Sequence, residues 1–435
     1  MNATQVAGDD TDLALAGATP DQPVDAGERI AALDFVRGVA VLGILFPNIV
    51  AYANPVLAYF WPLGLPGGAT DADKGFWLVQ LVLIDGKFRG LFTLLFGASM
   101  MLFMERAWAR GATRWLQARR LLWLAAFGLA HFFLVWTGDI LFLYALSGLG
   151  ALAMVKWAPR TQLRVGLAWF FAGSLALTVI LGGQAAMEGV PRVQQQAPAQ
   201  YEQVKKARAE MIARADKEAA ASAEGSYGDV VAYRLAEETG VFGQSVFFAL
   251  METIPLMLVG MALYRMGLFE RRFDPAKMRR WGWFGLIGGA LLTLPIAWWT
   301  LSAGFPLMLT QFAFNGPVQF LHLPMVLGLA ALLALWAPSA ARTWLGSRFV
   351  AAGRMAFSNY LGTSLVMMLV FQGWAGGLYG RFHRPELALF VVVAWVLMLA
   401  WSKPWLARYR YGPLEWLWRC LTYGRLFPLR RRQSG

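Results

Sequence analysis

Cysteine, histidine and charged residues are scarce in this sequence. The 435 residues include a single cysteine, Cys420, so an internal disulfide is impossible and a cysteine-based metal site is not expected. The three histidines form neither an HExxH motif nor a pair at helical spacing, and the chain has no P-loop. Charged residues make up 15% of the chain, against about 25% in soluble globular domains. These absences argue against a soluble fold, and we expect no metal and no tightly bound cofactor.

Long apolar runs dominate the chain, in which 58% of the residues are hydrophobic. A bilayer core about 30 Å thick is crossed by about 20 helical residues. We therefore expect an all-α integral membrane protein, a polytopic bundle of about ten transmembrane helices. The formal net charge of +13 would suggest a nucleic-acid partner for a soluble protein. Here the arginines cluster between apolar runs, as the positive-inside rule places them, so we expect membrane lipids and no nucleic acid as partners.

The arginine distribution also predicts the topology. The expected spans run approximately over residues 29–55, 85–105, 121–136, 140–154, 163–181, 245–264, 281–301, 320–336, 355–371 and 387–401. Five arginines between residues 105 and 120 place that short loop in the cytoplasm, which makes both termini cytoplasmic.

Three regions are expected from composition. Residues 1–28 are acidic and lack an apolar run, which predicts a disordered cytoplasmic tail. Residues 29–402 form the transmembrane domain, with a polar periplasmic insertion over residues 182–243. Residues 403–435 are basic and aromatic, as a cytoplasmic interfacial tail would be.

The stretch from Arg119 to Gly150 predicts a helical hairpin with its turn at residues 137–139. His131 lies within the apolar run, and Asp139 lies at the tip. An ionisable group in a membrane is costly unless it is paired or hydrated, so it is a functional hypothesis by default. A neutral imidazole can remove a proton from an attacking hydroxyl or amine, and a nearby carboxylate can orient the ring. A purely structural role for His131 stays open.

When depth in the membrane is estimated at about 1.5 Å per helical residue, one group of polar residues is expected in the outer half of the membrane. Its expected catalytic members are His131, Asp139 and Glu252, and its expected substrate-binding members are Asn48, Asp85, Lys87 and Arg89. Simpler roles remain open, namely interhelical hydrogen bonding for Asn48 and snorkelling to head groups for the two cations. The same group also suits the proton relay of a transporter.

A second polar group is expected at the inner face. Its members are Asp34, Arg37, Arg354, Ser358, Asn359, Glu415 and Arg419. Asp34 and Arg37 are one helical turn apart and can pair, which would also suit a structural anchor. The remaining histidines, His322 and His383, have no flanking acid that suggests a catalytic triad.

Five motifs, in order, resemble those of the YeiB-like bacterial inner-membrane proteins, a family filed under a domain of unknown function. They read RIAALDFVRGVAVLGILFPN, KFRGLFTLLFGAS, HFFLVWTGDILFLYAL, GRMAFSNYLGTS and YGPLEWLWRCLTYG. The resemblance covers about residues 29 to 425 and implies a multi-pass protein of the bacterial inner membrane. The family is distantly similar to a transmembrane acyltransferase superfamily that includes the heparan-α-glucosaminide N-acetyltransferase. Those enzymes pass an acyl group from a cytosolic thioester to a sugar on the far side.

That similarity implies roles for both polar groups. The inner group would bind an anionic donor such as acyl-coenzyme A, and the outer group would meet an envelope glycan, lipid or small-molecule acceptor. In the heparan enzyme the catalytic histidine follows the first span, whereas residues 52–75 contain none here, so its role is not carried over to His131. The alternatives are a proton-coupled transporter or lipid flippase and a scaffold without chemistry. The oligomeric state stays open.

Overall fold

The structure, a computed structural model, describes residues 31–431 except residue 271. The tail expected over residues 1–28 lies outside these described residues. Within them the chain folds into helices, and the only strand-like pairing is an isolated bridge between Tyr409 and Arg430. The expectation of an all-helical chain is confirmed for this part of the protein.

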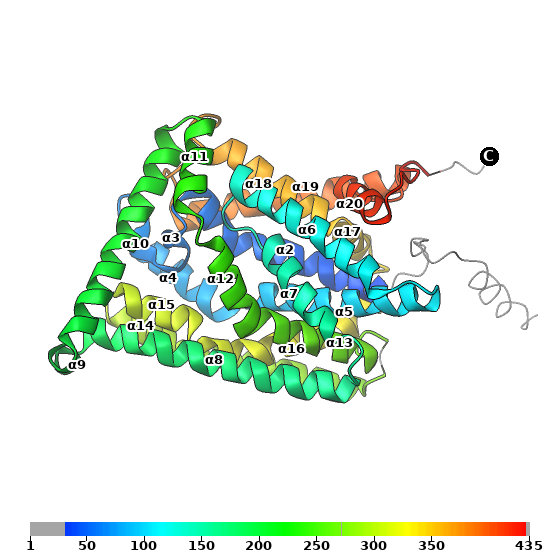
Figure 1. The fold of residues 1–435 in the computed structure, drawn as a ribbon, viewed down its shortest axis with the longest axis horizontal. Coiled ribbons are helices and arrows are strands. Elements are labelled where there is room, and N and C mark those ends of the chain that lie inside the picture. Colours follow the sequence, from blue (N-terminus) through cyan, green and yellow to red (C-terminus); the bar gives the residue numbers. More distant parts are fainter. Residues whose placement is uncertain (1–30, 271, 432–435) are drawn as a thin grey trace, which may run out of the picture.

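The longer helices lie side by side along one axis (Figure 1). They are α2 (Ala31–Ala53), α5 (Lys87–Ala109), α6 (Arg114–Leu134), α7 (Leu141–Ala153), α8 (Pro159–Gly189), α13 (Ile254–Arg265), α14 (Pro275–Ser302), α16 (Val318–Ala340), α18 (Ala356–Phe371) and α19 (Arg384–Arg408). The other elements are α3 (Leu57–Phe60), η2 (Pro62–Gly64), α4 (Asp71–Val79), η3 (Gln80–Ile84), α9 (Pro191–Gln196), α10 (Pro198–Glu224), α11 (Tyr227–Glu237), α12 (Val241–Phe248), η4 (Ala249–Thr253), α15 (Leu307–Asn315), α17 (Trp344–Arg354) and α20 (Pro413–Tyr423).

Within residues 31–431, six helical segments are long and apolar enough to cross a membrane. They are Ala31–Ala53, Pro159–Gly189, Phe242–Arg265, Pro275–Ser302, Leu307–Ala340 and Arg384–Arg408. The apolar helices α7 and α18 are shorter. Large apolar side chains such as Phe284 on α14 (67% exposed) and Leu389 on α19 (67%) cover the outside of the bundle. This surface suits lipid better than water, which agrees with the expected membrane protein.

Glycines let the first turns of α2 pack against α17 with their backbones almost in contact. A Cβ atom on Gly353 would lie 1.8 Å from the Asp34 carbonyl oxygen, and one on Gly38 would lie 2.0 Å from that of Phe349. Small residues at such positions are the usual means of close helix packing in membranes. This contact brings Arg354, at the end of α17, next to the first turns of α2.

The polar insertion crosses one end of the bundle, where α10 runs roughly perpendicular to the long helices (Figure 1). Val56 N–H donates to Glu218 on α10 (3.0 Å), and Gly373 N–H donates to the Ser222 carbonyl (2.8 Å). On α11, the Tyr227 hydroxyl donates to the Leu134 carbonyl at the end of α6 (3.1 Å). We call this end the insertion end. The opposite end, where α5 and α19 finish and α20 begins, is called the basic end.

Candidate functional site

A cavity of about 240 Å³ opens between α2, α5, α6, α7, α18 and α20 toward the basic end. Its lining includes five arginines, namely Arg37, Arg106, Arg120, Arg354 and Arg419. Of the described residues, two carboxylates, Asp34 and Glu415, line it as well, so five positive charges of this part of the chain face two negative ones. The remaining wall is mostly apolar and aromatic. An anion with an apolar tail matches such a lining.

The cavity is deep. Along α5 its lining extends from Arg106 to Phe92, which at about 1.5 Å per residue corresponds to roughly 21 Å of helix. The mouth of the cavity lies at the basic end. Its far part is bordered by Ile140, Tyr144 and Tyr360, near the turn between α6 and α7.

Two arginines of the cavity, Arg37 and Arg120, are held by contacts with neighbouring side chains. Arg37 pairs with Asp34 (Nη1 to Oδ1, 2.7 Å) and donates to Ser99 Oγ (2.7 Å), so the expected Asp34–Arg37 pair is present. The Arg120 guanidinium lies 4.1 Å from the ring centre of Trp418, and the Trp418 indole donates to the Arg120 carbonyl. These contacts fix cationic groups between the mouth and the level of Ser99 on α5, where they can meet an anion without large rearrangement.

Glu415 fastens α20 to the start of α18. Its carboxylate accepts hydrogen bonds from Phe357 N–H (2.8 Å), Ser358 N–H (3.0 Å) and the Ser358 hydroxyl. Burial raises the pKa of Glu415, while the bonds from Ser358 and Phe357 act in the opposite direction. A carboxylate at a helix N-terminus is a favourable cap. Glu415 therefore positions the α20 wall of the cavity.

Not every expected donor-binding residue reaches the cavity. Asp34, Arg37, Arg354, Glu415 and Arg419 line it. Ser358 is instead engaged by Glu415. Asn359 is buried, donates to the Ala352 carbonyl (3.1 Å) and to Ser402 Oγ (3.2 Å), and accepts from the Trp401 indole. The structure thus places Asn359 as a hydrogen-bonding link between α17, α18 and α19.

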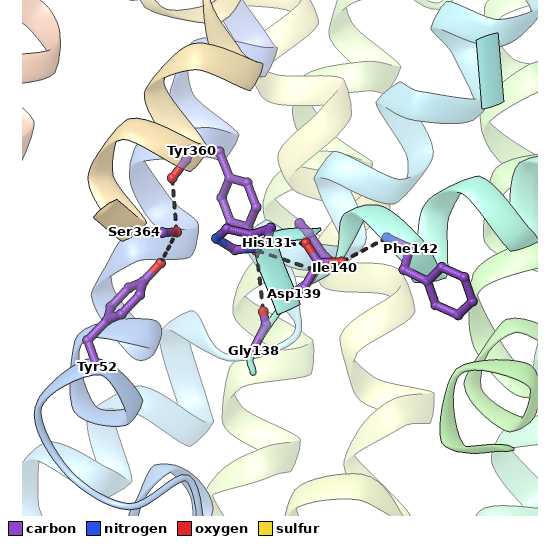
Figure 2. Close-up of polar contacts among 8 residues, drawn as sticks. All are labelled: Tyr52, His131, Gly138, Asp139, Ile140, Phe142, Tyr360 and Ser364. Atoms are coloured by element: carbon purple, nitrogen blue, oxygen red, sulfur yellow. Dashed lines mark hydrogen bonds and ion pairs between the residues drawn. The ribbon is translucent and has the colours of Figure 1, made fainter. Parts of the chain in front are cut away.

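The hairpin brings His131 and Asp139 together (Figure 2). His131 Nδ1 lies 2.9 Å from Asp139 Oδ1, and Asp139 Oδ2 accepts from Phe142 N–H (2.8 Å). The two side chains are about 1% exposed. With an ionised Asp139 as acceptor, Nδ1 carries the hydrogen and Nε2 keeps its lone pair. Nε2 is buried and has no hydrogen-bond partner among the described residues.

Tyr360 lies between the cavity and this pair. Its hydroxyl donates to the Gly138 carbonyl and accepts from Ile140 N–H, both at 3.3 Å. Its ring centre is 5.4 Å from that of His131, and the ring also lines the cavity. On the side of His131 away from Asp139, Figure 2 shows Tyr52 and Ser364, whose hydroxyls are 2.6 Å apart. The far part of the cavity is therefore one aromatic side chain away from the imidazole.

The remaining outer residues form a separate group. Glu252 pairs with Arg89 (Oε1 to Nη1, 2.7 Å) and makes no hydrogen bond or ion pair with His131 among the described residues, so the outer residues form two groups rather than the single group expected. Asp85 accepts from the Tyr59 hydroxyl, and the Lys87 ammonium donates to the Leu81 carbonyl (2.6 Å). Asn48 is half-buried on α2 and takes part in none of these contacts.

Two features of the outer group around Arg89 and Glu252 were not expected. His322 is 2% exposed and lies so close to Gly86 that a Cβ there would be 2.1 Å from its Nδ1. Glu252 lies on η4, and η3 ends directly before Asp85; both are π-helical turns, which occur often at functional sites. The spacing of apolar residues contains no sign of a π-turn, and His322 is far from this group in sequence.

Comparison with known proteins identifies the family. The "Uncharacterized protein YeiB" of Escherichia coli (strain K12) is 31% identical over 400 residues, covering 91% of this chain and 96% of that protein. The chain belongs to the YeiB-like family. The "Uncharacterized protein YxaH" of Bacillus subtilis (strain 168) is 30% identical over 425 residues, covering 92% of this chain and 96% of that protein. No solved structure matches significantly.

The family model described as "Protein of unknown function (DUF418)" also matches this chain, over residues 263–425. That match contains Arg354, Tyr360, Glu415 and Arg419. The opposite wall of the cavity, from α2, α5, α6 and α7, lies before residue 263 and is covered by the two longer similarities. The YeiB-like relatives therefore align with both walls of the cavity.

Proposed function

We propose that this protein is a membrane acyltransferase. It takes an acyl group from a cytosolic thioester donor, acyl-coenzyme A, and passes it to an acceptor at the periplasmic side: an envelope glycan, a lipid or a small molecule. One observation carries the proposal, namely a single cavity with five arginines at one end and Tyr360, next to the His131–Asp139 pair, at the other. A transmembrane acyl transfer needs these two ends in one pocket.

The proposed topology has ten spans in a bacterial inner membrane, both termini in the cytoplasm and residues 182–243 in the periplasm. It is supported by the helices that lie at all ten apolar segments, including α5 and α6, which are not among the six clear candidates. The arginines at the end of α5 and the start of α6 lie toward the basic end, and a membrane protein keeps such short basic connections in the cytoplasm.

The donor enters from the basic end in this proposal. Its phosphates bind the cavity arginines, because guanidinium groups match phosphate oxygens in charge and geometry. Its pantetheine arm follows α5 from Arg106 toward Phe92, so that the thioester carbonyl reaches the far part of the cavity, which Ile140 and Tyr360 border. Binding energy from the distant phosphates then positions a small reacting group.

The chemical step uses the lone pair of His131 Nε2. Nε2 takes the proton of the acceptor hydroxyl while the hydroxyl oxygen attacks the thioester carbonyl carbon; the new C–O bond forms and the C–S bond breaks. The coenzyme A thiolate leaves and takes a proton from the imidazolium, which restores the neutral ring. Asp139 holds the tautomer and stabilises the cation. Because His131 is 2% exposed, Tyr360 or the Tyr52–Ser364 pair must move to admit the acceptor.

Binding of acetyl-coenzyme A to purified protein in lipid nanodiscs tests the proposal. Replacing Arg37 or Arg354 with Gln should weaken binding by roughly tenfold or more, since a hydrogen bond to a charged group contributes about 1.5–3 kcal/mol. Arg342→Gln is the control, because Arg342 is exposed and does not line the cavity. Absence of thioester binding by the unmodified protein would remove the proposal. It would favour a proton-coupled transporter or flippase, for which the Arg89–Glu252 pair, with its buried Glu252 carboxylate, would be the natural centre.

A further inference from the structure

The far end of the cavity is closed by aromatic side chains. Phe92 and Tyr144 stack with ring centres 5.8 Å apart, and Phe96 lies 5.4 Å from Tyr144. All three line the cavity. We call Phe92, Phe96 and Tyr144 the aromatic floor. Beyond it lies the Arg89–Glu252 group, because Phe92 is one helical turn from Arg89 on α5.

Hydrogen bonds hold the aromatic floor in place. The Tyr144 hydroxyl lies 2.7 Å from the Thr93 hydroxyl and 3.2 Å from the Arg89 carbonyl oxygen. Tyr144 is 1% exposed, so its ring has no room to rotate away without leaving these partners. A buried ring that also anchors its polar end is a rigid wall. The floor therefore sets a definite limit to the depth of the cavity.

The depth of the cavity can be compared with the length of a donor. About 21 Å of α5 separates Arg106 from Phe92. An extended phosphopantetheine arm is about as long as four extended residues, or roughly 15 Å. The remaining distance of about 6 Å accommodates roughly four or five carbon atoms, at a little under the length of a C–C bond each.

We infer that the aromatic floor selects donors by acyl length, so that the protein accepts short acyl groups of up to about four or five carbons and excludes long ones. This inference rests on the proposed function, because it takes the cavity as the thioester site. It adds the residues that determine specificity: Phe92, Phe96 and Tyr144 limit the chain, while the arginines bind the head group, which all acyl-coenzyme A molecules share.

The test measures the affinity of the nanodisc-embedded protein for acetyl-, butyryl-, octanoyl- and palmitoyl-coenzyme A. The unmodified protein should bind butyryl-coenzyme A at least about tenfold more tightly than octanoyl-coenzyme A, since pockets discriminate added methylenes by such factors. Phe92→Ala should deepen the cavity and reduce that ratio to about threefold or less. Tyr144→Phe keeps the ring but removes its two hydrogen bonds, and should reduce the ratio less. Phe284→Ala, on the exposed face of α14, should leave the ratio unchanged.

The outcomes separate the inference from the proposed function. Equal affinity for all chain lengths, or an unchanged ratio in a folded Phe92→Ala variant, would overturn the floor while the thioester site stands. If Phe92→Ala does not fold, Phe92→Leu shortens the side chain with less loss of packing and must still lower the ratio. Absence of binding by any of the four thioesters would remove the donor site itself, and the inference with it.

Discussion

His131 and Asp139 face each other across the turn between α6 and α7, with 2.9 Å between Nδ1 and Oδ1. The contact depends on Gly128, one turn before His131, since a Cβ there would lie 2.3 Å from the Phe142 nitrogen and 2.9 Å from Asp139 Oδ2. The close approach of α7 to α6 therefore places the Asp139 carboxylate beside the His131 imidazole. A paired histidine with a free Nε2 suits proton transfer better than a lone buried ring would.

Replacing His131 should abolish turnover while donor binding persists. We expect His131→Ala to lower acyl transfer by about 10²–10⁴-fold, the usual contribution of a general base. His131→Asn should be equally inactive, because an amide can donate a hydrogen bond but cannot titrate near neutral pH. The readouts are single-turnover transfer from labelled acetyl-coenzyme A and, separately, thioester affinity. Full activity in His131→Asn would assign the ring a structural role and leave Glu252 as the base to test.

The proposed topology can be tested by labelling introduced cysteines in a Cys420→Ser background. Lys206 on α10 and Lys156 between α7 and α8 are both exposed, so a thiol at either position is accessible to reagent. A membrane-impermeant maleimide added to intact cells should label Lys206→Cys and spare Lys156→Cys until the cells are opened. Labelling in the opposite order would invert the orientation, and the cavity arginines would then face away from cytosolic coenzyme A.

Periodicity and charge predicted the helical fold well, because long apolar runs and arginine-rich loops record the two sides of a bilayer directly. The hairpin and the Asp34–Arg37 pair were predictable for a related reason, since both contacts are close in sequence. Arg106 and Arg120 carried a signal too, but it was interpreted only as topology, although both line the cavity.

Contacts between distant segments could not be predicted in this way. Glu252 and Arg89 are on helices whose rotation about their axes is set by packing, so depth alone did not show that they pair. The placement of Tyr360 between the cavity and His131 depends likewise on how α18 meets the hairpin. Asn359, expected in the inner polar group, likewise depends on distant segments, since its hydrogen bonds join α18 to α17 and α19.

Glu218 should make docking of the insertion sensitive to pH. Burial raises the pKa of this carboxyl from 4.5 to about 8, although the Val56 N–H opposes the shift; Glu238 adds to the rise, and Arg234 and Arg214 counteract it. An acid whose pKa is raised in the folded state contributes stability that is complete below about 4.5 and is lost as the pH rises through about 8. The protection factors of the α10 amides, which correct exchange for its intrinsic base catalysis, should therefore fall between pH 5 and 9.

A matched pair of variants checks this assignment. Glu218→Gln keeps an acceptor for the Val56 N–H but cannot ionise, so it should flatten the pH dependence of α10 exchange and slow it at pH 9. Glu210→Gln lies on an exposed part of the same helix and should change neither. If the pH dependence of α10 exchange were unchanged in Glu218→Gln, another carboxylate of the insertion would have to cause it.

The packing of α2 on α17 should be intolerant of a single methyl group at Gly353. A Cβ there would lie 1.8 Å from the Asp34 carbonyl oxygen, and backbone cannot move aside as a flexible side chain can. We expect Gly353→Ala to destabilise the protein by about 1–3 kcal/mol, as overpacking does. It should also weaken thioester binding, because it displaces Arg354 and the first turn of α2 together. Gly288→Ala on α14 is the control, since no atom lies within 4 Å of the added Cβ, and it should be neutral or stabilising. Thermal unfolding in detergent gives the first quantity and thioester affinity gives the second. A Gly353→Ala protein with unchanged stability and binding would show that α17 is not fixed against α2, and the arginine mouth would then need another support.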